Sequence, residues 1–220
     1  SAASDVYKRQ GDILLQQIAA GLTGIPGLRG HCYRMGGDEF VIIVEPEIFG
    51  DINMRMFVAL RAEDPLKRAA VQYMEELKRL GVSGSFTKPD NLHITLAFIG
   101  ESAYSKRAEQ AIRNVRSGPF VLESALAGRF GDILWLGFKK SGCLSELAEG
   151  VRAELTKAGF SLDNRPFKAH MTLARRVRLP AGRLLKMPPV QMQVKEICLM
   201  KSERGEKGLV YTPLYKKKLE

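Results

Sequence analysis

Histidine, cysteine and long apolar runs are all scarce in this 220-residue chain. Its three cysteines lie far apart and in no metal-ligand spacing, which is typical of free thiols in a reducing cytoplasm rather than of a disulfide framework or a zinc site. No apolar run approaches the length of a membrane-spanning helix, and no signal-peptide pattern opens the chain. We therefore expect a cytoplasmic protein that needs no membrane.

Positive charge is in excess but unevenly distributed. The net charge is +10, with −3 on residues 1–53 and +13 on residues 54–220. A basic surface attracts polyanions such as RNA, although charge alone does not identify the partner. The asymmetry predicts two unlike segments that meet near residue 53.

The acidic N-terminal segment carries a recognisable hairpin. Residues 1–10 show no core pattern, so we expect them to be disordered and leave their native origin open. Residues 11–22 have helical spacing, and the following strand, Gly-Gly turn and strand predict a hairpin around Gly36–Phe40, "GGDEF". Residues 11–46 resemble the second part of a GGDEF (diguanylate cyclase) domain. The first strand of that family, with its metal-binding acidic residue, is missing. We therefore interpret residues 11–53 as a partial GGDEF-like helix and hairpin.

A new pattern begins at Met54 and continues to the C-terminus. Boundary signals and apolar periodicity predict helices over residues 64–81, 104–117 and 143–159. Alternating or β-rich runs between and after them predict strands at 54–61, 83–101 with an internal turn, 119–139 around Gly131-Asp132, 168–177, 190–203 and 208–219, the last two as an antiparallel pair. This order of elements indicates an α+β domain over residues 54–220.

Two of the three histidines occur in the same four-residue frame. His93-Ile94-Thr95-Leu96 recurs 77 residues later as His170-Met171-Thr172-Leu173, at a similar place in a similar order of elements. Because side chains alternate along a strand, each histidine shares a face with its threonine, while the apolar residues face the core. An internal duplication about a pseudo-two-fold axis would bring two imidazoles and two hydroxyls to one cleft.

Such a cleft suits the hydrolysis of a phosphodiester. One imidazole can take a proton from the attacking water while the other protonates the leaving oxygen, and threonine hydroxyls can donate to the non-bridging oxygens. Two histidines and two threonines do not form a zinc shell, so we expect no metal and no cofactor. A single such motif is usually an ordinary strand, and it is the matched pair in a histidine-poor chain that indicates a shared site.

Residues 54–220 resemble the 2H phosphoesterase superfamily, and within it the LigT-like RNA 2′,3′-cyclic phosphodiesterases, formerly described as 2′-5′ RNA ligases. The resemblance lies in "MRMFVAL", "KPDNLHITLAFIGE", "ILWLGF", "RPFKAHMTLAR" and "GLVYTPLYKKKL". It implies a two-lobed fold with two pseudo-symmetric antiparallel sheets, helices outside and a central groove. It also implies hydrolysis of a terminal 2′,3′-cyclic phosphate to a 2′-phosphate.

The resemblance also implies roles for individual residues. His93 would be the proton donor to the leaving oxygen and His170 the proton acceptor, while Thr95 and Thr172 would hold the phosphate. Because the site is nearly symmetric, the assignment of donor and acceptor is the weakest of these inferences.

Three other residues are candidates for the groove. Arg175 follows the second motif and could contact phosphate. Strand alternation would turn it away from the site unless the strand bulges, so a surface arginine is an equally weighted alternative. Phe86 stands where the family commonly has tryptophan and could stack on a base. Trp135 is predicted to lie in the core.

The expected partner is RNA with a 2′,3′-cyclic phosphate end, or a cyclic nucleotide, bound by a monomer. The main alternative is a binding module for RNA ends or cyclic nucleotides without turnover. A cyclase or cyclic-di-GMP sensor based on Asp38 and Glu39 is disfavoured by the incomplete domain. Weak reverse 2′-5′ ligation, and other phosphodiester substrates such as 2′-5′ oligonucleotides or ADP-ribose cyclic phosphate, also stay open.

Overall fold

The structure is a computed structural model that describes residues 30–36, 39–44, 53–178, 186–206 and 208–220. The chain divides into two compact units, Ser1–Ile52 and Asn53–Glu220, which we describe separately. In the first unit, β1 (Gly30–Gly36) and β2 (Glu39–Val44) form an antiparallel pair. The predicted strand pair is thus confirmed. The predicted helix over 11–22 lies outside the described residues, and the GGDEF-like interpretation stays a prediction.

The second unit alternates strands and helices in the predicted order. Its elements are β3 (Met54–Arg61), α2 (Leu66–Arg79), β4 (Ser83–Phe86), the 3₁₀ turn η1 (Pro89–Asn91), β5 (His93–Ser102), α3 (Ser105–Asn114), β6 (Phe120–Phe130), β7 (Ile133–Phe138), α4 (Gly142–Lys157), β8 (His170–Arg178), β9 (Gln191–Val194), β10 (Glu196–Gly205) and β11 (Gly208–Lys218).

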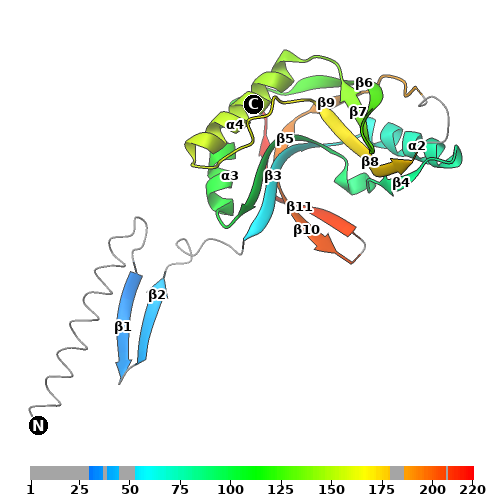
Figure 1. Ribbon diagram of the computed structural model, residues 1–220. Coiled ribbons are helices and arrows are strands. Elements are labelled where there is room, and N and C mark those ends of the chain that lie inside the picture. Colours follow the sequence, from blue (N-terminus) through cyan, green and yellow to red (C-terminus); the bar gives the residue numbers. More distant parts are fainter. Residues whose placement is uncertain (1–29, 37–38, 45–52, 179–185, 207) are drawn as a thin grey trace, which may run out of the picture. The chain divides into compact units, whose positions relative to one another are not determined.

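The strands form two antiparallel half-sheets that meet at their inner edges (Figure 1). The first half-sheet has the order β11-β10-β3-β5, and the second has the order β8-β7-β6-β9, with β4 added on β8. Strands β5 and β8 are joined by one residue pair, Ile94 with Met171. The predicted α+β fold is confirmed, with the refinement that its two sheets are joined at this seam.

Each half-sheet is covered in part by a helix that the other half contributes. Helix α4 follows β7 along the chain but contacts β5 of the first half-sheet. Helix α2 follows β3 but lies beside β4, which pairs with β8 of the second (Figure 1). The buried positions of α4 recur at helical spacing: Leu144, Leu147, Ala148, Val151 and Leu155. The helices therefore lock the two halves together around one core.

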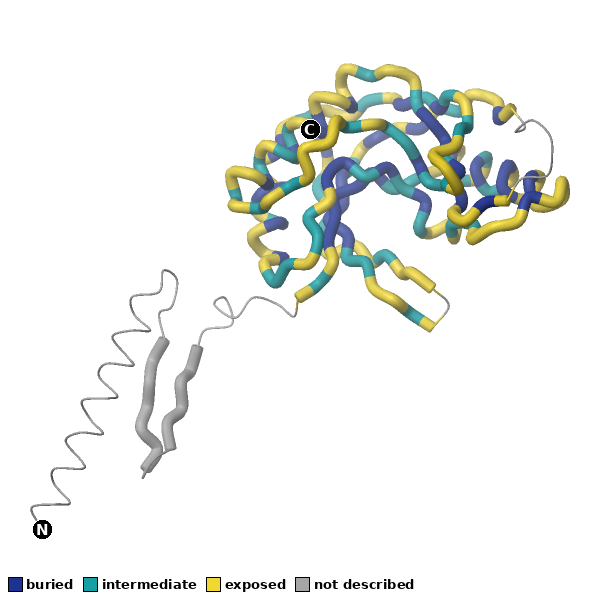
Figure 2. The backbone as a smooth tube through the Cα atoms, viewed as in Figure 1, coloured by how far each residue is buried: buried dark blue, intermediate teal, exposed yellow. Residues whose placement is uncertain are grey.

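Strand β3 shows how the sheet separates the core from the site. Met56, Val58 and Leu60 are buried in the main core between sheet and helices. Phe57 and Ala59 point to the other face and join a small cluster with Cys198, Met200 and the partly buried Tyr211. Figure 2 shows β3 in the buried colour along most of its length, as its burial on both faces requires. The second cluster provides an apolar floor on the face opposite the helices.

The segment predicted as one strand over 190–203 is two strands in different half-sheets. β9 pairs with β6 at the outer edge of the second half-sheet, whereas β10 pairs with β3 and β11 in the first. β9 alternates apolar and polar residues, and β10 begins with the continuous apolar run Ile197–Met200. Both patterns are typical of strands, so the pattern alone could not detect the change of partner at Lys195. The prediction that the last two strands pair is confirmed for β10 and β11.

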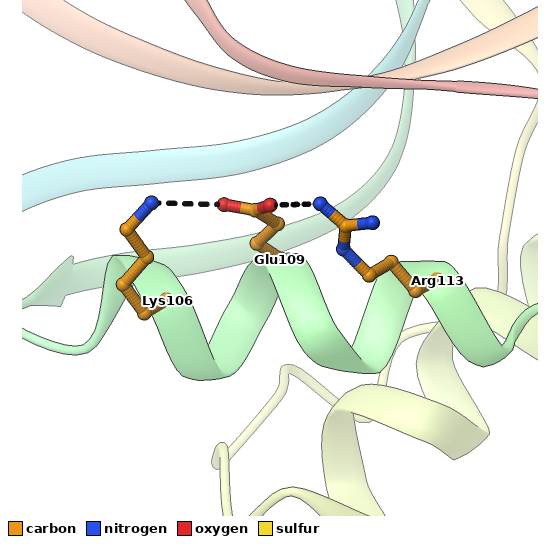
Figure 3. A network of polar contacts seen from close by, with 3 residues as sticks. All are labelled: Lys106, Glu109 and Arg113. Atoms are coloured by element: carbon orange, nitrogen blue, oxygen red, sulfur yellow. Dashed lines mark hydrogen bonds and ion pairs between the residues drawn. The ribbon is translucent and has the colours of Figure 1, made fainter.

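Helix α3 carries a short ion-pair network in which Glu109 binds two cations (Figure 3). Its carboxylate accepts from Lys106 at 3.4 Å and from Arg113 at 2.5 Å, and the bond from Arg113 holds the pKa of Glu109 below its usual range. The Arg113 guanidinium also lies over the Tyr215 ring of β11, 4.6 Å from its centroid. Exposed helix pairs contribute only about 0.3–0.5 kcal/mol each, so this network chiefly orients α3 against β11.

Candidate active site

The two His-x-Thr motifs meet at the seam between the half-sheets. Both begin their strands, β5 at His93 and β8 at His170, and the pair that joins the strands is Ile94 with Met171. In an antiparallel register this pairing sets Thr172 across from His93 and Thr95 across from His170. Ile94 and Met171 are fully buried, so their neighbours occupy the opposite, open face. The predicted convergence of the two motifs is therefore present.

A bulge follows each motif at the same position. Strand β3 pairs Val58 with Ala97 and Ala59 with Thr95, so the register skips one residue of β5. In β8 the register with β7 likewise skips Leu173. A bulge reverses the alternation beyond it, as the adjacent buried pairs Leu96-Ala97 and Leu173-Ala174 show.

The reversal brings Arg175 to the open face, although simple alternation would point it away. By the same step, Phe98 reaches the site from β5. Each of the two residues stands five positions after its histidine. The bulge that a role for Arg175 requires is therefore present in β8.

A cavity of about 580 Å³ contains both motifs. Among the residues that the structure describes, its lining includes three arginines and no carboxylate. These lining residues are Arg55, Phe57, His93, Thr95, Phe98, Arg165, His170, Thr172, Arg175, Ser202, Leu209 and Tyr211. A cation-lined cavity without acidic groups favours an anionic ligand. Of the predicted site residues, the structure brings together both histidines, both threonines and Arg175.

Each imidazole is oriented by a backbone carbonyl two residues upstream. His93 Nδ1 lies 2.6 Å from Asn91 O, and His170 Nδ1 lies 2.7 Å from Lys168 O. A carbonyl oxygen only accepts, so Nδ1 carries the proton and donates in both rings. The Nε2 atoms are left for chemistry, as a lone pair in the neutral ring or as a donor in the charged ring.

The two imidazoles nevertheless have different surroundings. His93 packs against Phe57 and Tyr211, with ring centroids 4.9 and 5.1 Å away, and its Nε2 lies 3.1 Å from Thr95 Oγ1. Burial on this apolar floor lowers the pKa of His93, and the nearby charges of His170 and Arg175 lower it further. Among the described residues, His170 makes one ring contact, an edge-on approach to Phe130 at 5.9 Å.

One wall of the cavity comes from the β10–β11 hairpin, whose outer end extends past β3 (Figure 1). Ser202, Leu209 and Tyr211 reach the cavity from this wall. Asn91 Nδ2 donates to Leu209 O at 2.8 Å, which ties the hairpin to the turn that also orients His93. The wall and the first motif are therefore held together.

Two aromatic residues considered from the sequence lie outside the cavity lining. Phe86 lies in β4 and pairs with Ala174 of β8. Its ring packs against the main core, and Lys78 Nζ lies 5.0 Å from the ring centroid. Its position therefore gives no support to a role in stacking on a base. Trp135 is only partly buried, and its ring stacks on Phe130 at 4.8 Å. Phe130 in turn meets the His170 ring edge-on, so Trp135 packs against a neighbour of His170.

The sequence interpretation did not include seven of the lining residues. Most of them come from strands at distant positions in the chain, which no local pattern connects. Phe98 is different, because it stands at the same offset from its histidine as Arg175 does from the other. Aligning the two motifs beyond their fourth residue would have identified it.

Comparisons with known proteins find similarity to one family of RNA-processing proteins. The sequence profile of the 2′-5′ RNA ligase superfamily matches residues 64–206. A curated Archaeoglobus fulgidus protein named RNA 2′,3′-cyclic phosphodiesterase is 34% identical over 182 residues, which cover 73% of this chain and 98% of that protein. A Thermotoga maritima protein of the same name is 29% identical, with 76% of this chain and 96% of the relative covered.

Solved structures give the same result at the level of the fold. Escherichia coli LigT in its apo form superimposes with a TM-score of 0.66 and 26% identity, covering 77% of this chain and 99% of LigT. The complex of the same protein with 3′-AMP gives a TM-score of 0.63 at 25% identity, over 77% and 99% of the two chains. A Thermus thermophilus structure gives 0.60 at 30% identity, over 76% and 98%.

Proposed function

Because this chain belongs to the 2′-5′ RNA ligase superfamily, within the 2H phosphoesterases, we propose that it hydrolyses the 2′,3′-cyclic phosphate at the end of RNA to a 2′-phosphate. The observation that carries the proposal is the convergence of both His-x-Thr motifs and Arg175 in one cavity, whose described lining contains no carboxylate. The relatives that bear the name RNA 2′,3′-cyclic phosphodiesterase support the choice of substrate.

The proposed reaction needs one proton acceptor and one proton donor. His170 takes a proton on Nε2 from a water molecule as its oxygen attacks phosphorus. The bond from phosphorus to the 3′-oxygen breaks, and His93 gives its Nε2 proton to that oxygen. Each histidine ends in the form in which the other began, so proton exchange with solvent completes the cycle. Since both proton transfers belong to imidazoles, no step requires a metal ion.

The negative charge of the phosphate lies on its non-bridging oxygens during the reaction. The hydroxyls of Thr95 and Thr172 and the guanidinium of Arg175 are the proposed donors to them. Thr95 Oγ1 contacts His93 Nε2 in the free protein, so phosphate binding must exchange this contact for one to an oxygen. That exchange leaves His93 Nε2 facing the leaving group.

The lowered pKa of His93 bears on its proposed role. A general acid must hold its proton in the substrate complex, and burial of His93 acts against this in the free protein. A bound phosphate monoanion would stabilise the imidazolium and oppose that effect. We therefore assign the acid role to His93 in the substrate complex, not in the free protein.

The test is hydrolysis of a cyclic-ended oligonucleotide or a 2′,3′-cyclic nucleotide in the presence of EDTA, with the 2′- and 3′-phosphate products separated. Wild type should yield the 2′-phosphate, and the variants His93→Ala and His170→Ala should lose that activity. Turnover that ignores both substitutions would refute the two-histidine mechanism. Tight binding of RNA ends without turnover would favour the non-catalytic binding module. If the 5′-hydroxyl of a second RNA replaces water as the nucleophile, its attack on phosphorus expels the same 3′-oxygen and forms a 2′-5′ phosphodiester. We therefore also expect weak 2′-5′ ligation of cyclic-ended RNA when 5′-hydroxyl ends are in excess.

A further inference from the structure

The bulges give the two halves of the site different fifth residues. Phe98 occupies in β5 the place that Arg175 occupies in β8. A cation after the second motif is expected in a phosphate site, but a benzene ring cannot bind phosphate. At this position the second half therefore offers phosphate a cation, whereas the first half offers an aromatic ring.

Phe98 is a ring left open to the cavity. Its side chain is 42% exposed, although it belongs to a strand whose other large apolar residues are mostly buried. The guanidinium carbon of Arg55 lies 4.8 Å from its ring centroid, and Arg55 also lines the cavity. Two planar groups, one aromatic and one cationic, thus stand together on the first half-sheet.

The other aromatic side chains near the motifs have their faces or edges occupied. Phe57 and Tyr211 pack against each other and against His93, with centroids about 5 Å apart in each case. Phe130 is stacked on Trp135 and lies outside the cavity lining. Among the aromatic side chains of the described lining, Phe98 is the one with more than a third of its surface exposed.

We propose that Phe98, together with Arg55, binds the nucleobase of the nucleotide that carries the reacting phosphate. Nucleobases stack on aromatic rings and on arginine planes, and every base has a face that can do so. The proposal rests on the proposed function and deepens it. It also gives the nucleotide a direction in a nearly symmetric cleft, with the phosphate between the imidazoles and the nucleoside over β3 and β5.

The test compares a ligand that has a base with one that lacks it. Calorimetry would measure the binding of 2′-AMP and of ribose 2-phosphate to wild type, Phe98→Leu, Phe98→Tyr and Tyr104→Leu. Phe98→Leu should weaken 2′-AMP binding roughly tenfold and leave ribose 2-phosphate within about twofold of wild type. Phe98→Tyr keeps a ring and should bind both ligands as wild type does.

Tyr104 is the matched control. It is also an exposed aromatic residue with an arginine over its ring, Arg107 at 4.2 Å, but it does not line the cavity. Tyr104→Leu should therefore leave both affinities unchanged. An equal loss of both ligands in Phe98→Leu would indicate distortion of the site and overturn the proposal. Unchanged 2′-AMP binding in that variant would overturn it as well.

The outcome is separable from that of the proposed function. If wild type hydrolyses the cyclic phosphate but shows no difference between the ligands with Phe98→Leu, only the base site is refuted. If wild type binds 2′-AMP with the expected contrast but hydrolyses nothing, the base site stands and the hydrolytic function fails. Failure of wild type to prefer 2′-AMP over ribose 2-phosphate would refute the base site directly.

Discussion

The two halves of the site have similar backbone geometry but carry different side chains around their histidines. Each supplies a histidine fixed through Nδ1, a threonine two residues on, and a bulge after the threonine. The first half adds an apolar floor and Phe98, and the second adds Arg175 in a more open setting. In the proposed mechanism the similar backbone provides two proton carriers, and the differences in burial and charge between the halves give them separate tasks.

The largest effect should come from separating the tasks of the two histidines with an altered leaving group. Removing a general acid or base typically costs about 10²–10⁴-fold in rate. A substrate with sulfur in place of the 3′-oxygen leaves without a proton. His93→Ala should therefore lose far less of its kcat/KM on this substrate than on the oxygen substrate, whereas His170→Ala should lose as much on both.

The opposite pattern would reverse the proposed roles. Equal losses on both substrates in both variants would mean that neither histidine protonates the leaving group. Circular dichroism melting curves for the two variants would show that they fold.

The next largest effect should come from removing Arg175, the cation that the second half places in the cavity. Arg175→Ala removes a charged donor to phosphate and should lower kcat/KM by roughly 10- to 100-fold. Arg178 lies on the same strand and is exposed, but it does not line the cavity, so Arg178→Ala is the matched control for loss of one positive charge. Steady-state kinetics at two salt concentrations would compare them. Equal losses in the two variants would point to long-range attraction instead of a direct contact.

A smaller effect concerns the packing of Trp135 against Phe130, the ring that meets His170 edge-on. A Cβ atom at Gly128 would overlap the Trp135 indole, and that ring supports Phe130. Gly128→Ala should therefore destabilise the fold by about 1–3 kcal/mol through overpacking. Gly118→Ala serves as the control, because a Cβ there meets no atom within 4 Å. Urea unfolding of both variants measures their free energies of unfolding. Equal values would mean that the indole can move aside without destabilising the fold.

The smallest effect is a pH dependence of stability that arises from His93, in the first half of the site. The pKa of His93 is lowered from its usual 6.5, so below that pH the unfolded chain binds more protons at this residue than the folded chain. This contribution to stability is present above about pH 6.5 and is lost as pH falls from there toward the folded pKa. Melting temperatures from about pH 7 to about pH 5 should fall less steeply in His93→Gln than in wild type. A steeper fall in the variant would contradict the burial argument.

Local patterns in the sequence predicted the elements and half of the site. Apolar periodicity and boundary residues placed α2, α4 and the motif strands, because those signals depend on neighbours along the chain. The repeated tetrapeptide predicted which four side chains converge. The change of partner between β9 and β10 was missed, because strand pairing depends on residues far away in the sequence.

The residues beyond the tetrapeptides were harder to place. Arg175 reaches the cavity through a bulge that alternation alone does not predict. Phe86 packs against the main core instead of lining the cavity. Phe98 could have been found by extending the alignment of the two motifs. Arg55 and Tyr211 could not, because only the assembled half-sheet brings them to the cavity.

The seam at Ile94 and Met171 has a consequence for how this domain could be divided. Each half-sheet is covered in part by a helix that the other half contributes, and each half supplies one histidine to the cleft. A single half expressed alone would therefore leave part of its sheet uncovered and would carry one histidine instead of two. The cleft is in this sense a property of the whole domain, because neither half-sheet holds both histidines.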